Sequence, residues 1–201
     1  FAGGSQVNAN VRRDDKFSNR TRKLHGRKAE ILDAFVYGRF DVNDMALNLR
    51  AGRFTQLYGE SLFFGNNGIA GAQTSLDLIK AMSVPNSQFK EIMRPTGQLS
   101  GQLQINQNVS VGAYYQLEWR KSRLPASGSY FSFADFVDSG GDYLYVAAGP
   151  ELMRLNRASD KDAKNSGQGG VQLKIKSGNF EYGVYAAQYH DKMPQFYAYP
   201  D

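Results

Sequence analysis

Apolar and polar residues alternate with a period of two along six stretches of the chain, the pattern of a β-strand whose two faces meet different surroundings. In the middle of the chain, Leu99, Gly101, Leu103 and Ile105 alternate with serine, glutamine and asparagine. Short turns join the stretches in pairs, so the pattern predicts three antiparallel hairpins. The six predicted strands cover residues 29–40, 45–54, 97–106, 109–120, 169–177 and 180–190.

The connections between these strands have two very different lengths. The turns within the hairpins are short, whereas the predicted loops cover residues 1–28, 55–96 and 121–168. The strands are close to the ~9–11 residues that a tilted strand needs to cross a bilayer. Short turns on one side and long loops on the other are typical of barrels in the outer membrane of Gram-negative bacteria.

We therefore expect an all-β fold, an antiparallel up-and-down transmembrane β-barrel whose long extracellular loops contain short helices, with a single domain over residues 1–201. Six strands are too few to close a barrel across a bilayer, since the smallest such barrels have about eight. The expectation is therefore a partial barrel, a fragment of a wall that further strands complete.

The aromatic residues favour a membrane, although alternation alone would also fit a soluble sheet. Phe40 and Phe180 lie on the apolar face at the short-turn end of their strands, and Trp119 lies on the same kind of face at the opposite end. Aromatic girdles occupy these positions at the two membrane–water boundaries. We predict that these three residues form a lipid-facing girdle.

The polar face of the predicted strands is the best candidate for a functional site. A wet lumen lined by amides and by charges of both signs would have little ion selectivity. The alternative is the solvated face of an ordinary sheet. The predicted lumen-lining residues are Asn48, Arg50, Gln98, Gln102, Gln104, Gln116, Glu118, Arg120, Lys174, Lys176, Glu181 and Tyr185.

Arg53 does not fit this division, because the alternation puts it on the apolar face. Either Gly52 marks a β-bulge or the strand has already left the apolar zone at that point.

The loop at 55–96 has the pattern of two short amphipathic helices, which end before Pro85 and Pro95. Such helices need a surface to pack against, and the inside of a lumen provides one. The loop would then fold inward and narrow the pore, whereas a cap on the outer rim is the alternative. The apolar residues of the predicted constriction loop are Leu76, Ile79, Met82, Phe89 and Ile92.

Charge changes the picture at one place only. The formal net charge is +5, but residues 11–28 alone carry eight basic and two acidic residues. In an outer membrane this segment would contact lipopolysaccharide phosphates through charge-assisted hydrogen bonds. A solvated loop is an equal alternative, and nucleic-acid binding is not expected because Phe17 is the segment's only stacking aromatic.

Several kinds of chemistry lack the residues that they need. There is no cysteine, which excludes disulfides and thiolate chemistry. The glycine-rich run 65–71 lacks the Gly-Lys-Ser/Thr of a phosphate-binding loop. His25 and His190 have no nucleophile beside them in the sequence, and the Asp160–Asn165 segment lacks the pattern of a calcium loop. We expect no enzyme, no cofactor and no metal site.

Three long stretches resemble a known family. They run from Gly59 to Gln102, from Ser110 to Ser132 and from Ser166 to Tyr197, the last reading SGQGGVQLKIKSGNFEYGVYAAQYHDKMPQFY. They are similar to the proteobacterial domain of unknown function 1302, a family of outer-membrane β-barrel proteins, and the resemblance covers roughly residues 24–197. It implies an outer-membrane location and a role in moving hydrophobic or lipid-like molecules, alongside periplasmic and inner-membrane export partners. It carries over no catalytic residues.

Three functions stay open from the sequence. The first is an outer-membrane channel or porin-like transport protein with outer-membrane lipid and lipopolysaccharide as its surroundings. The second is a soluble β-sandwich that binds glycans or polyanions, and the third is an outer-membrane enzyme with a site on its loops. The apolar face distinguishes the first from the second: in a barrel Val111, Tyr115 and Leu117 are exposed, and in a sandwich they pack against a second sheet.

Overall fold

The computed structural model describes residues 19–26, 30, 33–59, 69–132, 136, 138, 140–141, 143–148 and 151–199. The chain has two compact units where the sequence predicted a single domain. Unit 1 consists of residues 1–30, 77–87 and 123–162, and unit 2 consists of residues 31–76, 88–122 and 163–201.

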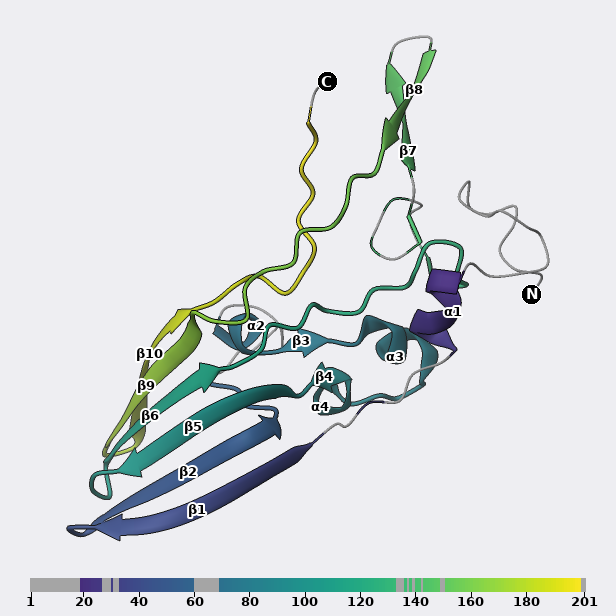
Figure 1. The fold of residues 1–201 in the computed structure, drawn as a ribbon. Coiled ribbons are helices and arrows are strands. Elements are labelled where there is room, and N and C mark those ends of the chain that lie inside the picture. Colours follow the sequence, from purple (N-terminus) through teal and green to yellow (C-terminus); the bar gives the residue numbers. More distant parts are fainter. Residues whose placement is uncertain are drawn as a thin grey trace. The chain divides into compact units, whose positions relative to one another are not determined.

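Unit 2 is built around a six-stranded antiparallel sheet (Figure 1). Its strands are β1 (Ala34–Val42), β2 (Met45–Phe54), β5 (Thr96–Gln104), β6 (Val109–Gln116), β9 (Gln168–Ser177) and β10 (Phe180–Gln188). The order in the sheet is β1-β2-β5-β6-β9-β10, so the three hairpins lie side by side. This sheet confirms the antiparallel all-β prediction. In the part of the chain that the structure describes, β1 and β10 are edges that do not pair with each other, so the sheet is open.

Residues at the hairpin tips explain two of the turns. Between β1 and β2, Asn43 and Asp44 have φ angles of 50° and 64°. Two consecutive left-handed residues are what a tight hairpin turn requires, and asparagine and aspartate tolerate this conformation well. Between β5 and β6, the side-chain oxygen of Asn106 accepts hydrogen bonds from the backbone N–H groups of Asn108 (2.8 Å) and Val109 (2.9 Å).

The ends of the strands differ from the prediction. The first begins at Ala34, and of the residues predicted before it, 29, 31 and 32 lie outside the described residues. The strand predicted over 109–120 ends at Gln116. The second difference has a local cause. The carboxylate of Glu118 accepts the backbone N–H of Gly97 at 2.9 Å, in place of a carbonyl of the neighbouring strand.

The predicted loops contain strands that the alternation did not reveal. Within 121–168, β7 (Tyr143–Ala148) pairs with β8 (Glu151–Asn156). The first of these is apolar at every position, so it has no period-two signal. Within 55–96, β3 (Ser75–Leu76) pairs with β4 (Met93–Arg94), and two residues are too few to make a pattern.

The helices are short. Unit 2 contains α2 (Ile69–Gln73) and α4 (Phe89–Ile92), and unit 1 contains α1 (Asn19–His25) and α3 (Leu78–Ser83). None of the helices in the described part of the chain has the length and apolar character needed to cross a membrane.

Unit 1 is held together around Arg123. Its guanidinium donates to the carboxylate of Asp77 and to the backbone carbonyl of Leu24. The same aspartate caps α3 by accepting the N–H of Lys80 at 3.1 Å. The helix α1 is attached through Thr21, whose hydroxyl donates to the carbonyl of Ser127 at 3.1 Å.

Candidate functional site

The two faces of the six-stranded sheet are reversed relative to those of a soluble protein. Along β6, Ser110, Tyr114 and Gln116 are buried, with Gln116 fully inaccessible. The alternate residues Val111 and Tyr115 are 37% and 43% exposed. A soluble sheet normally buries its apolar side chains and leaves its polar ones in water. Here, the apolar face is open, and the polar face is covered around Gln98, Tyr114 and Gln116, whereas Arg50 and Gln102 of the same face are exposed.

The apolar face extends across all six strands, because residues opposite each other in the register share a face. The row through Val36, Ala51, Leu99 and Tyr115 is one example. Many of the larger side chains of this face are at least 37% exposed, whereas Leu47, Leu103 and Leu173 are partly buried. The exposed ones are Val36, Phe40, Leu49, Leu99, Val111, Tyr115, Val171, Ile175, Phe180, Tyr182 and Val184, with Leu117 just beyond β6.

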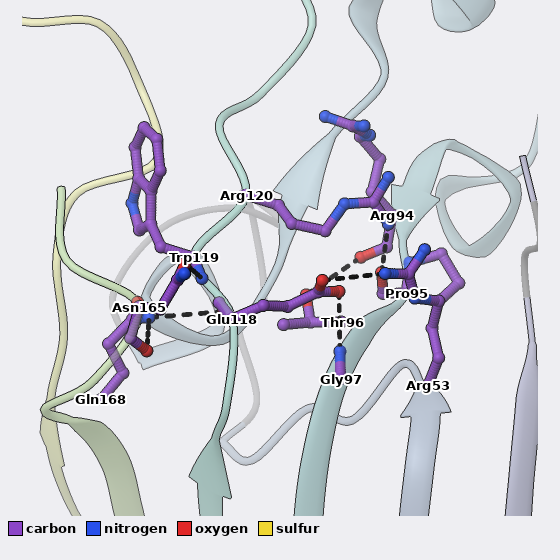
Figure 2. Close-up of polar contacts among 10 residues, drawn as sticks. All are labelled: Arg53, Arg94, Pro95, Thr96, Gly97, Glu118, Trp119, Arg120, Asn165 and Gln168. Atoms are coloured by element: carbon purple, nitrogen blue, oxygen red, sulfur yellow. Dashed lines mark hydrogen bonds and ion pairs between the residues drawn. The ribbon is translucent and has the colours of Figure 1, made fainter. Parts of the chain in front are cut away.

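The predicted girdle residues lie at the two ends of this face. Phe40 and Phe180 are 53% and 69% exposed and lie next to the hairpin turns. Trp119 lies beyond the opposite end of β6 and is partly buried (Figure 2). Its indole N–H donates to the carbonyl of Asp191 at 3.0 Å, and its backbone N–H donates to the side chain of Asn165 at 2.9 Å. The single tryptophan is therefore fixed in place by hydrogen bonds.

The polar face aligns three of the predicted residues, Asn48, Gln102 and Tyr185, in one row across five strands. Asn48 is opposite Gln102, which is opposite Gly112. Gly112 is opposite Gln172, which is opposite Tyr185. The next row but one on this face contains the buried glutamines Gln98, Gln116 and Gln168. The predicted residues that share this face are Asn48, Arg50, Gln98, Gln102, Gln104, Gln116, Lys174, Lys176, Glu181 and Tyr185.

The other two predicted lumen residues, Glu118 and Arg120, lie past the end of β6 and are not part of these rows. Glu118 forms an ion pair with Arg53 at 2.8 Å and accepts the N–H of Gly97 (Figure 2). Arg120 donates to the carbonyl of Pro95. The strand β6 ends at Gln116, so its alternation does not assign these two residues to either face.

The ion pair with Glu118 also explains Arg53. The register of β2 continues without an inserted residue from Arg50 to Phe54, so Gly52 does not mark a bulge. Gly52 has a φ of +132°, and a Cβ there would lie 2.4 Å from the carbonyl oxygen of Ala34. The second explanation therefore holds. The strand β2 has already left the apolar zone at Arg53, whose side chain pairs with the carboxylate of Glu118.

Two segments of the 55–76 connection are packed against the polar face through amide groups. Gln73 is the centre of this contact: its side-chain oxygen accepts the N–H of Tyr58 at 2.6 Å, and its amide donates to the carbonyl of Tyr58 at 2.9 Å. The side chain of Gln116 donates to the backbone carbonyl of Gln73, and that of Gln98 donates to Phe54 at 2.8 Å. All three glutamines are at most 2% exposed.

The ring of Tyr58 adds an aromatic contact to this cluster. It packs edge-on against Tyr114 of the polar face, with the ring centres 5.3 Å apart. A Cβ at Gly112 would lie 2.8 Å from the Tyr58 hydroxyl, so glycine leaves the room that this ring occupies. Burial raises the pKa of Tyr58 to about 12.

Lys192 closes the cluster from the C-terminal side. Its side chain is 2% exposed, and its ammonium donates to the carbonyl of Ala72 at 2.7 Å and to the side-chain oxygen of Gln168 at 3.3 Å. Its own carbonyl accepts the N–H of Ser122 at 2.7 Å. Burial lowers the pKa of Lys192 to about 8, against a smaller opposing effect of Asp191. Nothing in the local sequence distinguishes this lysine from an exposed one.

The residues predicted for the constriction loop are divided between the two units. Leu76 is buried in β3, and Phe89 and Ile92 are partly exposed in α4 of unit 2. Ile79 and Met82 belong to α3 of unit 1, where the first is buried and the second is 48% exposed. The segments that contact the polar face are residues 54–58 and 69–73 instead. Amide hydrogen bonds hold them there, which a search for apolar helical faces does not detect.

Charged side chains on the polar face are paired, with one exception. Arg39 lies 3.7 Å from Asp41, and Lys174 lies 3.2 Å from Glu181. Lys176 shares that carboxylate at 3.9 Å. Arg50 instead stacks its guanidinium on two aromatic rings, 4.6 Å from the centre of Phe35 and 5.1 Å from that of Phe54.

Other candidate residues have local partners. His190 shares a hydrogen bond of 3.1 Å with the carbonyl of Ser166, and Asp160 is paired with Arg157. Over the described ranges, no three acidic or histidine side chains are grouped as a metal site would need. Of the basic segment 11–28, residues 11–18 and 27–28 lie outside the described residues. The remainder forms α1, on which Arg20, Arg22 and Lys23 are exposed.

Comparison with known proteins gives one finding. The model of a family described as a protein of unknown function, DUF1302, matches residues 2–200. Neither a curated protein nor a solved structure matches the chain. Because the family match spans almost the whole sequence, the chain belongs to the DUF1302 family.

Proposed function

We propose that unit 2 forms part of the wall of a transmembrane β-barrel in a bacterial outer membrane, and that the barrel is a passive conduit for hydrophobic or lipid-like molecules. The main support for this proposal is that the exposure of the apolar and polar faces of the sheet is reversed relative to that in a soluble protein. A polar face that packs against polar loop segments and an apolar face that is exposed suit a wall between a wet interior and lipid.

The energy of the apolar face supports a lipid neighbour. Fully burying a large apolar side chain contributes roughly 1.5–3 kcal/mol, whereas whole domains are stable by only about 5–15 kcal/mol. Val36, Val184 and Phe180 are 72%, 65% and 69% exposed, and Leu49, Leu99 and Val171 are 44%, 48% and 52% exposed. If this entire surface were in water, the lost burial energy would be large compared with the total stability of a domain. Contact with lipid removes that cost.

A soluble sandwich is the less well supported alternative. It would need a second sheet large enough to cover six strands. In the ranges that the structure describes, the other two sheets, β3–β4 and β7–β8, have two strands each. A layer of that size would leave most of the apolar face in water.

The surroundings of the barrel follow from the same proposal. Lipid would contact the apolar face, and lipopolysaccharide phosphates would contact exposed Arg20, Arg22 and Lys23 of α1. Segments 54–58 and 69–73 would narrow the conduit, because they lie on the polar face. We propose transport without catalysis, in company with periplasmic and inner-membrane export partners.

Single-cysteine labelling tests which face meets lipid, and the absence of cysteine from this chain removes native background. A nitroxide label at Leu99→Cys should collide more with oxygen, which concentrates in lipid, than with a water-soluble nickel chelate. The matched control is Gln102→Cys on the opposite face of the same strand, where the nickel chelate should dominate. Both residues are exposed in β5. The complete protein, folded into liposomes, is the sample.

The same collision ratio at the two positions would show that both faces meet one medium, and the barrel proposal would be wrong. A detergent-free soluble protein would contradict it in the same way. Conduction is measured separately, as the current through single proteins in a planar bilayer.

A further inference from the structure

The polar face has one cation that is not matched by an anion. Arg50 is exposed, and no carboxylate of the described residues forms an ion pair with it. The other cations of this face, Arg39, Lys174 and Lys176, are each within 4 Å of an aspartate or glutamate. A guanidinium has five N–H donors in a planar fork that fits a carboxylate.

The surroundings of Arg50 are aromatic. Its guanidinium lies 4.6 Å from the ring centre of Phe35 and 5.1 Å from that of Phe54, and these two rings pack edge-to-face at 5.8 Å. Tyr37, its partner across the β1–β2 register, is 80% exposed. These cation–π contacts hold the guanidinium beside the two rings without using its N–H donors as an ion pair would.

We propose that Arg50 binds the carboxylate of an amphipathic acid, a monoanion with an apolar body that lies against Tyr37 and Phe35. This inference rests on the proposed conduit and names the class of molecule that it passes. A single guanidinium neutralises one negative charge. A phosphate dianion would need a second cation, and Arg39, which the register places diagonally next to Arg50 on this face, is paired with Asp41.

The position suits a passing molecule. Arg50 is opposite Ser100, which is opposite Tyr114, so the charge lies in the row that the Tyr58 ring covers two strands away. An acid held at Arg50 would therefore lie beside the segment that narrows the conduit. Binding by one charge-assisted bond and one aromatic contact is weak enough for release.

The test is binding of 2-naphthoate to the complete protein in nonionic detergent, followed by the fluorescence of the naphthalene ring. The matched probe is 2-naphthalenemethanol, which has the same ring without the charge. We expect naphthoate to bind at least about tenfold more tightly than the alcohol, since one hydrogen bond between charged groups is at stake. Arg50→Gln should abolish that preference, and Arg39→Gln, whose arginine is paired with Asp41, should keep it.

Equal affinity for the acid and the alcohol in the unmodified protein would overturn the proposal without any variant. A preference for the acid that survives Arg50→Gln would also overturn it. So would an equal loss of that preference in Arg39→Gln and Arg50→Gln, because either result would indicate a general electrostatic effect of the face rather than a site at Arg50. Conduction is recorded independently in planar bilayers. Preferential naphthoate binding without conduction would contradict the proposed conduit and support the site at Arg50. Conduction without the preference for naphthoate would support the conduit and contradict the site.

Discussion

Lys192 places an ammonium group among neutral amide and carbonyl oxygens. Burial without a carboxylate contact disfavours the charged form, which is why its pKa falls from 10.5 to about 8. The lowered pKa makes the free energy of unfolding depend on pH. Between pH 8 and 10.5 the unfolded chain holds a proton on this lysine that the folded chain has released, so stability rises with pH in that window.

Replacement of Lys192 by methionine should remove this pH dependence. From pH 7 to 9.5 the unmodified protein should gain on the order of 2 kcal/mol of unfolding free energy relative to Lys192→Met. The measurement is urea unfolding of the detergent-folded protein at both pH values. Parallel behaviour of the two proteins would show that the lysine is already solvated in the folded state.

At the scale of the element, two hairpins contain a glycine with a positive φ, Gly52 in β1–β2 and Gly178 in β9–β10, and the surroundings of the two differ. Gly52 has a φ of +132° and no room for a Cβ, since the Ala34 carbonyl oxygen and the Phe35 Cα would be 2.4 and 2.6 Å away. Gly178 in the β9–β10 turn has a φ of +59° and nothing within 4 Å. At Gly52, both steric contact and backbone conformation oppose a larger residue. At Gly178, only the backbone conformation opposes it.

These two positions make a matched pair of substitutions. Gly178→Ala should cost about 1 kcal/mol of unfolding free energy, the usual cost of a left-handed residue with a Cβ. Gly52→Ala should cost about 3 kcal/mol or more, because strain and a backbone clash add. Denaturant titration of the two variants measures the difference, and similar losses would mean that the hairpin relaxes around the new methyl group.

Alternation located the six strands because each has two dissimilar faces, as Leu99, Gly101 and Leu103 illustrate. It could not say which face is buried, since a soluble sheet has the same pattern with the opposite exposure. The contacts of Gln73 were also out of reach, because a buried amide and a solvated one look alike in a sequence. The end of β6 depends on the side chain of Glu118, which no periodicity describes.

At the scale of the whole molecule, the polar face has more basic than acidic side chains. Glu181 alone balances Lys174 and Lys176. If this face lines a conduit, its charge sets the preference between small cations and anions.

Glu181→Gln should therefore shift the conduit towards anions. The reversal potential of single proteins under a potassium chloride gradient measures this preference. Asp162→Asn in unit 1 removes the same charge from a residue outside the sheet and should leave the potential unchanged. Equal shifts for both variants would indicate an effect of net charge rather than of the polar face.

The glutamine cluster around Gln73 has a consequence for conditions outside the cell. Ion pairs between exposed groups weaken as salt is added, because the Debye length falls to about 3 Å at 1 M. The hydrogen bonds that the amides of Gln73, Gln98 and Gln116 donate to backbone carbonyls carry no net charge and are buried. Segments 54–58 and 69–73 should therefore keep their position on the polar face at low and at high salt concentration. The width of the proposed conduit that they would narrow should then be independent of salinity.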